Sequence, residues 1–281
     1  TFGEGNPLET SKKFLETTCP KCKSKAQRET DTMDTFVDSS WYFLRYCDNK
    51  NIQKPFDIKK VDYWLPVDQY IGGAEPADMH LLYARFFTKV FKDMNLVKFN
   101  EPFLKLLNQG TVTKDGVKMS KSYGNVVSQE EIASKYGIDV ARLFVLFVAA
   151  PDSDMEWNDS GVEGIHKFLL KTVNLLEKKR GKNNRYLEHK MHTAIKEVTE
   201  DVEHFKFNLA IIKIMDYVNY LRDQETISTE SLEILSKLLS VFTPHIAEEL
   251  WEKIGKRNFV SIAPWPKYNI KLIDKEAEKA G

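Results

Sequence analysis

The sequence of 281 residues has only three cysteines, no net charge and no long apolar run. Its longest uninterrupted apolar segment, residues 143–150, has eight residues, whereas a membrane-spanning helix needs about 18. No basic stretch followed by an apolar core opens the chain, so no secretory signal is visible and the cytoplasm is the expected location. These absences exclude an integral membrane protein and a disulfide-stabilised scaffold.

The balance of charges excludes binding of nucleic acid through the overall charge of the chain. The basic residues and the acidic residues both number 41, so the chain as a whole has no field that would attract a polyanion. Any binding to nucleic acid must therefore come from local basic patches. We also expect no membrane partner.

Composition divides the chain into two parts. Glycines and short aromatic or β-branched runs concentrate before residue 140, whereas residues 160–255 are rich in Leu, Ile, Lys and Glu at helical spacing. This predicts an α/β domain over residues 1–150 and an all-α domain over residues 151–281. At the boundary, Pro151 stops a helix that Asp139 would cap. Within the second domain, Leu209 and Ile212 are expected in the core of a helix bundle.

One segment of the first domain predicts a strand, a glycine turn and a helix. Residues 61–71 favour a strand, Gly72 and Gly73 favour a turn, and Asp78 could cap a helix with apolar residues every three or four positions. Open α/β sheets bind nucleotides at such junctions, because glycine lets a ligand approach the backbone closely. Most glycine turns are only turns, so the junction alone is weak support for a nucleotide site.

The strongest local signal is the segment 113–125, Thr-Lys-Asp-Gly-Val-Lys-Met-Ser-Lys-Ser-Tyr-Gly-Asn. Lys118 and Lys121 can place two ammonium groups on one polyphosphate, and Ser120 and Ser122 add hydroxyl donors. A solvated basic turn is the alternative interpretation. The Lys-Met-Ser-Lys-Ser segment, with its flanking residues, resembles the signature loop of class I aminoacyl-tRNA synthetases.

Three further segments extend this resemblance. Residues 29–46 and 64–75 are similar to stretches of leucyl-tRNA synthetases, and residues 243–251 resemble a helical-domain signature shared by the leucine, valine, isoleucine and methionine enzymes. The resemblance covers nearly the whole chain. It implies the second, α/β half of a Rossmann-type catalytic domain, followed by an all-α helix-bundle domain of the anticodon type that binds tRNA.

One motif of the family is missing. The His-x-Gly-His motif, which binds ATP in the first half of the catalytic fold, does not occur in the sequence. The resemblance therefore implies the C-terminal half, or the beta subunit, of a split leucyl enzyme. An N-terminal, alpha-type chain with that motif and the editing domain would complete a heterodimer; a shortened enzyme is the alternative.

The resemblance also implies a reaction. Leucine would be activated by ATP, with Mg²⁺ as the accompanying ion, and then transferred to tRNA(Leu). Positioning and charge stabilisation would carry the first step, because the leucine carboxylate is itself the nucleophile. Two alternatives remain open: a fragment of a valyl, isoleucyl or methionyl enzyme, and a non-catalytic subunit for tRNA binding or assembly.

Individual residues take their expected roles from the family motifs. Lys118 and Lys121 would be catalytic, because they would hold the departing pyrophosphate. The expected ATP or adenylate site comprises Gly72, Gly73, Glu75, His80, Gln109, Lys118, Ser120, Lys121 and Ser122. The expected leucine pocket comprises Phe36, Ser39, Tyr42, Tyr70 and His80. The first three of the pocket residues are spaced to share one helical face, as residues of a core helix also would.

Two more groups have open interpretations. The basic run of Lys178, Lys179, Arg180, Lys182 and Arg185 is a candidate tRNA contact, and plain solvation explains it equally well. Cys19 and Cys22 resemble half of a zinc ribbon, but a structural zinc site has four ligands. Cys47 or the partner chain would have to complete it, so zinc and a metal-free thiol pair both stay open.

Overall fold

The computed structural model describes residues 5–73 and 75–273, without the side chains of residues 75–77. The chain forms two compact units: residues 1–70 with 75–106, and residues 71–74 with 107–281. The units divide near residue 106, whereas composition places a domain boundary at 150, which stays a prediction. No helix among the described residues is both long and apolar enough to cross a membrane.

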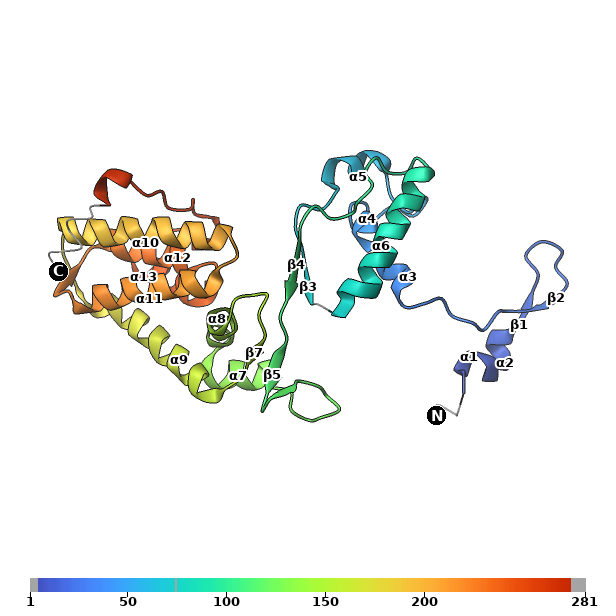
Figure 1. Cartoon of the computed structure of the whole chain (residues 1–281), viewed down its shortest axis with the longest axis horizontal. Helices are drawn as coiled ribbons and strands as arrows, with labels where there is room; N and C mark the ends of the chain where they lie inside the picture. The colour runs from blue at the N-terminus through green and yellow to red at the C-terminus, as the bar shows by residue number, and fades with distance from the viewer. Residues whose placement is uncertain (1–4, 74, 274–281) are drawn as a thin grey trace. The chain divides into compact units, whose positions relative to one another are not determined.

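The first unit is built from short elements and one long helix (Figure 1). Its elements are α1 (Pro7–Thr10), α2 (Lys12–Leu15), β1 (Glu16–Thr18), β2 (Lys25–Gln27), α3 (Phe36–Ser39), α4 (Tyr42–Tyr46), α5 (Ile58–Trp64), the strand residue Tyr70 of β3, and α6 (Glu75–Asp93). The strands β1 and β2 pair antiparallel. A small core is formed by Phe43, Leu44, Phe56, Val61, Ala84 and Val97. This core joins α4, α5 and α6.

Three predictions for this unit are wrong. Residues 58–64 are a helix, because the side chain of Asp57 accepts the backbone N–H groups of Lys59 and Lys60 and caps it; the strand β3 spans only Tyr70–Gly73. Asp78 lies inside α6 and does not cap it. The pocket residues 36, 39 and 42 do not share one helix, because Trp41 (φ −140°, ψ 7°) separates α3 from α4.

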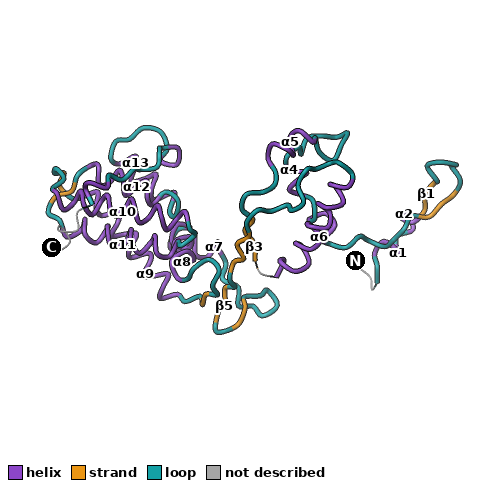
Figure 2. Tube along the Cα trace, turned by 45° about the horizontal axis from the view of Figure 1, so that its top comes forward, coloured by secondary structure: helices purple, strands orange, loops and turns teal. Residues whose placement is uncertain are grey.

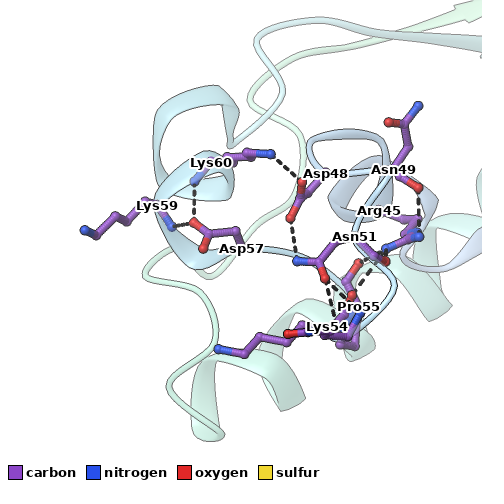
Figure 3. Close-up of polar contacts among 10 residues, drawn as sticks. Arg45, Asp48, Asn49, Asn51, Lys54, Pro55, Asp57, Lys59 and Lys60 are labelled. Atoms are coloured by element: carbon purple, nitrogen blue, oxygen red, sulfur yellow. Dashed lines mark hydrogen bonds and ion pairs between the residues drawn. The ribbon is translucent and has the colours of Figure 1, made fainter.

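A polar cluster shapes the loop between α4 and α5 (Figure 3). The guanidinium of Arg45 donates, at 2.8 to 3.3 Å, to the backbone carbonyls of four loop residues: Asn49, Asn51, Lys54 and Pro55. Buried Asp48 accepts hydrogen bonds from the Lys60 ammonium and the Asn51 amide, and these hold the pKa of its carboxyl below the usual value. The cluster satisfies backbone groups of the loop that carries Phe56 into the core.

The second unit begins with a small sheet and two helices. These are β4 (Leu106–Gln109), β5 (Val112–Lys114), β6 (Val117–Lys118), α7 (Gln129–Tyr136), α8 (Ile138–Val148) and β7 (Met155–Glu156). The strand β4 pairs with β3, and β5 lies between β6 and β7. The β5–β6 pair is antiparallel and the β5–β7 pair is parallel. Helix α8 ends at Val148, just before Pro151, as the sequence predicts.

Helices then dominate the chain, as the colouring of Figure 2 makes plain. The elements are α9 (Asp159–Val173), η1 (Asn174–Glu177), β8 (Lys179–Arg180), α10 (Arg185–Glu203), α11 (Phe207–Asp223), β9 (Thr226–Ile227), α12 (Thr229–Leu239), α13 (Pro244–Lys253), η2 (Val260–Ile262) and η3 (Ile270–Leu272). A single large core lines their inner faces. The expectation of an α/β part followed by a helix bundle is confirmed.

Two details of the bundle differ from expectation. Leu209 and Ile212 are 41% and 40% exposed, so they are not core residues; α11 instead turns Ile211, Ile214 and Val218 inward. The apolar positions of α11 permit more than one inward face, and packing against its neighbours selects one.

Asp139 also has a different role from the predicted one. It does not cap its own helix, α8, which begins after Gly137 (φ +87°). Asp139 is 4% exposed, and its carboxylate accepts hydrogen bonds from Nδ1 of His245 and from the backbone N–H of Ile246, both at 2.8 Å. Asp139 thus caps the N-terminus of α13 from another helix.

Candidate functional site

The segment 113–125 folds into a braced hairpin followed by a tight turn. The strands β5 and β6 are joined by Asp115 and Gly116, whose φ angles of 56° and 72° suit the two-residue hairpin turn that Asp-Gly favours. On β7, Glu156 accepts hydrogen bonds from the Thr113 hydroxyl and from the Gly116 backbone N–H. These bonds lower the pKa of Glu156, so this carboxylate remains charged while it braces the turn.

The turn after β6 is held by Asn125. Its Oδ1 accepts the backbone N–H of Ser120 at 2.8 Å, and its Nδ2 donates to the Lys118 carbonyl at 3.3 Å. The backbone N–H of Gly124 (φ 67°) donates to the carbonyl of Lys121 at 3.3 Å and closes the turn. The motif includes Asn125, but sequence reasoning gave this residue no role, because its hydrogen bonds become visible only when the turn is closed.

The predicted phosphate-binding groups lie on this scaffold. Lys118 is on β6 and Lys121 is on the turn, and both residues are exposed. The hydroxyl oxygens of Ser120 and Ser122 are 2.7 Å apart. A short, braced loop that presents cations and hydroxyl donors has the chemistry needed to bind a polyphosphate.

In the first unit, three of the predicted pocket residues form one hydrogen-bonded chain. The hydroxyl of Tyr42 donates to the hydroxyl of Tyr70 at 3.1 Å, and the Tyr70 hydroxyl lies 2.7 Å from Nε2 of His80. The Tyr70 hydroxyl that accepts from Tyr42 keeps its own proton and a second lone pair, so it can pair with either tautomer of the His80 imidazole.

Burial determines the protonation states of His80 and Tyr70. Burial lowers the pKa of His80, so its imidazole is neutral near pH 7. The pKa of the Tyr70 hydroxyl is raised, first by burial and then by the Tyr42 hydroxyl. The Tyr70 ring stacks on Phe103 with the centroids 3.9 Å apart. The three side chains therefore present neutral, mostly aromatic surface, which suits an apolar ligand with a few polar groups.

The other two pocket residues lie nearby in sequence but have different contacts. Phe36 of α3 faces Tyr83 of α6, with ring centroids 6.1 Å apart. The hydroxyl of Ser39 donates to the carbonyl of Phe36 at 3.2 Å, within its own helix. The structure thus brings Tyr42, Tyr70 and His80 together. The role of Ser39 in a leucine pocket stays a prediction.

The residues predicted for the adenylate site lie on several elements. Gly72 and Gly73 lie on the strand β3, so the turn predicted at these glycines is wrong. Gln109 ends β4, the strand that pairs with β3. The side chain of Glu75 lies outside the described residues. Next to Gln109, a Cβ at Gly110 would lie 2.0 Å from the Ser153 carbonyl oxygen, so only glycine fits there. The assembly of these residues into one site stays a prediction.

Two of the three cysteines of the first unit, Cys19 and Cys22, lie in the β1–β2 hairpin. The backbone N–H of Cys19 donates to the Ser24 carbonyl at 2.8 Å, and the Cys22 Sγ is 3.1 Å from the Ser24 hydroxyl. Hydrogen bonds from Ser24, and then from Cys19, lower the pKa of Cys22 to about 7. Cys47 is packed elsewhere, with its Sγ 3.4 Å from the Phe43 carbonyl.

These cysteines do not make a complete zinc site. In the part of the chain that the structure describes, no three His, Cys, Asp or Glu side chains lie close enough to hold a metal ion. Since structural zinc takes four protein ligands, Cys19 and Cys22 fit only half of such a site. Zinc at this pair stays a prediction that requires ligands from elsewhere.

The basic run lies around β8, at one end of the bundle. Lys179 and Arg180 form β8, which pairs parallel with β9. Lys182 lies in the following loop and Arg185 begins α10; both are exposed. Lys178 donates to the Gln224 backbone carbonyl.

Two segments of the chain match known protein families. Residues 5–158 match the family of class I tRNA synthetases (I, L, M and V), and residues 184–281 match the anticodon-binding domain of tRNA ligases. Similar curated proteins are the leucine–tRNA ligases of Fervidobacterium nodosum, 46% identical over 94% of this chain, and Petrotoga mobilis, 48% identical over 98% of this chain. The resemblance to leucyl enzymes is confirmed.

A solved structure is also similar. It is a ternary complex of Agrobacterium radiobacter K84 agnB2 LeuRS with tRNA and LeuAMS, 37% identical, with a TM-score of 0.84 over 98% of this chain. The chain spans 35% and 36% of the two curated relatives and 38% of the solved chain. It therefore matches about a third of the length of these proteins.

Proposed function

The chain belongs to the class I tRNA synthetases of the isoleucine, leucine, methionine and valine group, and we propose that it supplies the signature loop and the tRNA-binding domain of a leucine–tRNA ligase. The observation that carries this proposal is the braced loop, in which Asn125 holds the turn that presents Lys118 and Lys121. The leucyl relatives support leucine over the other three amino acids of the group. The reaction serves protein synthesis, and we propose that the protein is located in the cytoplasm.

In the proposed activation step, a carboxylate oxygen of leucine attacks the α-phosphorus of ATP. The bond from this phosphorus to the oxygen that bridges to the β-phosphate breaks, and pyrophosphate leaves with the electron pair. Lys118 and Lys121 stabilise the negative charge that develops on the leaving group. Mg²⁺, when bound with ATP, would supply further charge neutralisation. In the second step, the 2′-hydroxyl of the terminal tRNA adenosine attacks the leucyl carbonyl carbon and AMP leaves.

The aromatic chain of Tyr42, Tyr70 and His80 is proposed to line the leucine site. Its neutral state near pH 7 avoids an unpaired charge beside an apolar side chain. Such a pocket discriminates against one missing methylene by only about 1–3 kcal/mol. We therefore assign the removal of wrongly activated amino acids to an editing domain that lies outside this chain.

The outer face of α6 supports the need for a partner. Four apolar side chains spaced along this helix and its end are 46% to 63% exposed: Met79, Leu82, Phe86 and Met94. An exposed apolar stripe of this kind marks a protein interface. Because the chain spans about a third of its leucyl relatives and has no His-x-Gly-His motif, we propose that the first half of the catalytic domain covers this stripe.

Leucine-dependent exchange of pyrophosphate into ATP tests the proposal. The chain alone should be silent, and exchange should appear when a chain with the His-x-Gly-His motif and the first half of the catalytic domain is added. Leu82→Asp with Phe86→Asp should abolish the exchange without changing the unfolding transition of the chain. Ile52→Asp, at a residue 97% exposed elsewhere on this unit, is the control and should have no effect.

Three results would contradict the proposal. Exchange by the chain alone would remove the need for a partner. A preference for valine, isoleucine or methionine would assign the chain to another member of the group. Full activity of Lys121→Ala in the completed enzyme would favour a non-catalytic subunit that binds tRNA or assists assembly.

A further inference from the structure

A small basic pocket lies at one end of the helix bundle. Its volume is about 210 Å³, and five residues line it: Lys171, Asn174, Leu175, Lys178 and Arg222. Three of the five are cations, one is an amide, and none is acidic. They come from α9, from η1 and the residue after it, and from the last turn of α11. Sequence reasoning named only Lys178 among them.

The pocket has one buried apolar residue and a fixed cation. Leu175, which lines it, is buried in the bundle core. The Lys178 ammonium donates to the backbone carbonyl of Gln224, directly after α11, and this contact uses one of its three N–H donors. One N–H group of the Arg222 guanidinium donates to Oδ1 of Asn219 at 3.3 Å. Both cations therefore keep donors for a ligand.

The neighbouring Arg180 binds backbone carbonyl groups. Its guanidinium donates to the carbonyls of Leu176 at 2.9 Å and Lys178 at 2.6 Å, and so satisfies backbone groups at the end of η1. Part of the basic run is therefore structural. The three cations that line the pocket instead span 51 positions of the sequence, from Lys171 to Arg222.

Three cations around one small cavity repel one another unless an anion lies between them. The partial negative charges at the C-terminal ends of α9 and α11 offset this repulsion only in part. Asp223, the last residue of α11, and Glu225, two residues beyond it, do not line the pocket. An anion with several acceptor oxygens would use the remaining donors, and the planar Arg222 side chain can bind two such oxygens at once.

We propose that this pocket binds a phosphate group of the RNA backbone. The volume accommodates a phosphate but leaves little room for a whole nucleotide, and Arg222 lies within the segment that matches anticodon-binding domains. The inference rests on the proposed function, because it names a contact between the helical unit and tRNA. It shifts the expected contact from the consecutive basic run to cations gathered from three elements.

The test measures binding of tRNA(Leu) to the completed enzyme by fluorescence anisotropy over a range of salt concentrations. Lys171→Gln with Arg222→Gln should weaken binding on the order of tenfold at low salt and make the slope of log affinity against log salt shallower by somewhat less than one. Lys253→Gln with Arg257→Gln removes the same charges from an exposed part of the bundle and should leave both quantities unchanged.

Further measurements separate the explanations. Circular dichroism should give the same unfolding transition for both double variants, and leucine-dependent pyrophosphate exchange should remain normal, so a failure of the proposed function would be seen separately. Lys179→Gln with Lys182→Gln should weaken tRNA binding less than the pocket variant. Equal tRNA affinity for the pocket variant and its control would overturn the inference. So would stabilisation by inorganic phosphate that is lost in the pocket variant while tRNA affinity stays unchanged, because the pocket would then bind a free anion.

Discussion

Replacing Asp139 by alanine should lower the free energy of unfolding of the helical unit by about 2 kcal/mol. The lost contacts are the bonds from Asp139 to the backbone N–H of Ile246 and to Nδ1 of His245, both 2.8 Å long. Removing a side chain that caps a helix N-terminus costs about 0.5–2 kcal/mol. The His245 side chain is 72% exposed, so water replaces its partner and this pair adds less than about 1 kcal/mol.

The two contributions can be separated by a second variant. His245→Ala keeps the Asp139 cap on Ile246 and should cost less than about 1 kcal/mol. Asp139→Asn keeps one acceptor oxygen and should fall between the alanine variant and the parent. Urea unfolding, followed by far-ultraviolet circular dichroism and by the fluorescence of buried Trp157 and Trp251, reports on this unit.

The reasoning has a clear point of failure. If Asp139→Ala changes the free energy of unfolding by less than about 0.5 kcal/mol, it behaves as a surface substitution and the capping role is wrong. If His245→Ala costs as much as Asp139→Ala, the ion pair and not the helix cap carries the stability.

Three further predictions concern the sites. Tyr42→Ala should raise the KM for leucine in the completed enzyme far more than the KM for ATP, and Tyr42→Phe should recover most of the loss because it keeps the ring; equal effects on both KM values, with lower thermal stability, would make Tyr42 a core residue. Lys121→Ala should slow adenylate formation about 100- to 1,000-fold in single-turnover measurements. Transfer from preformed leucyl-adenylate should change much less, because pyrophosphate has already left, so equal slowing of both steps would refute the role of Lys121. Alkylation of Cys22 by iodoacetamide should rise as the pH passes through about 7, since the thiolate is the nucleophile and Ser24 lowers its pKa. Ser24→Ala should move this profile to higher pH, as read by mass spectrometry of the labelled peptide, and an unmoved profile would remove the role of Ser24.

Features that depend on neighbours in sequence were predictable from the chain alone. The Asp-Gly pair of the signature hairpin specifies a turn with two positive φ angles, and the structure has that turn. The helical periodicity after residue 160 specifies the bundle, and Pro151 marks the end of the preceding helix. These patterns succeed because turn geometry and helix period are set by residues only a few positions apart.

Other local patterns were ambiguous, and packing decided between their interpretations. The aromatic and β-branched residues from 61 onward suit a strand. However, the Asp57 cap and the burial of Val61 in the small core of the first unit make residues 58–64 a helix. The apolar residues of α11 allow several inward faces, and contact with the neighbouring helices leaves Leu209 and Ile212 exposed. At these positions the local preference for one conformation or face is smaller than the free energy gained by burying apolar side chains.

The remaining features needed the tertiary structure. Asp139 lies 106 positions from His245, whose helix it helps to cap, and Lys171 lies 51 positions from Arg222, with which it lines the basic pocket. A sequence states which side chains can donate, accept or carry charge, but it does not state which of them meet. That is decided when helices far apart in the chain pack against one another, because burying their apolar faces fixes the positions of the polar groups at their ends.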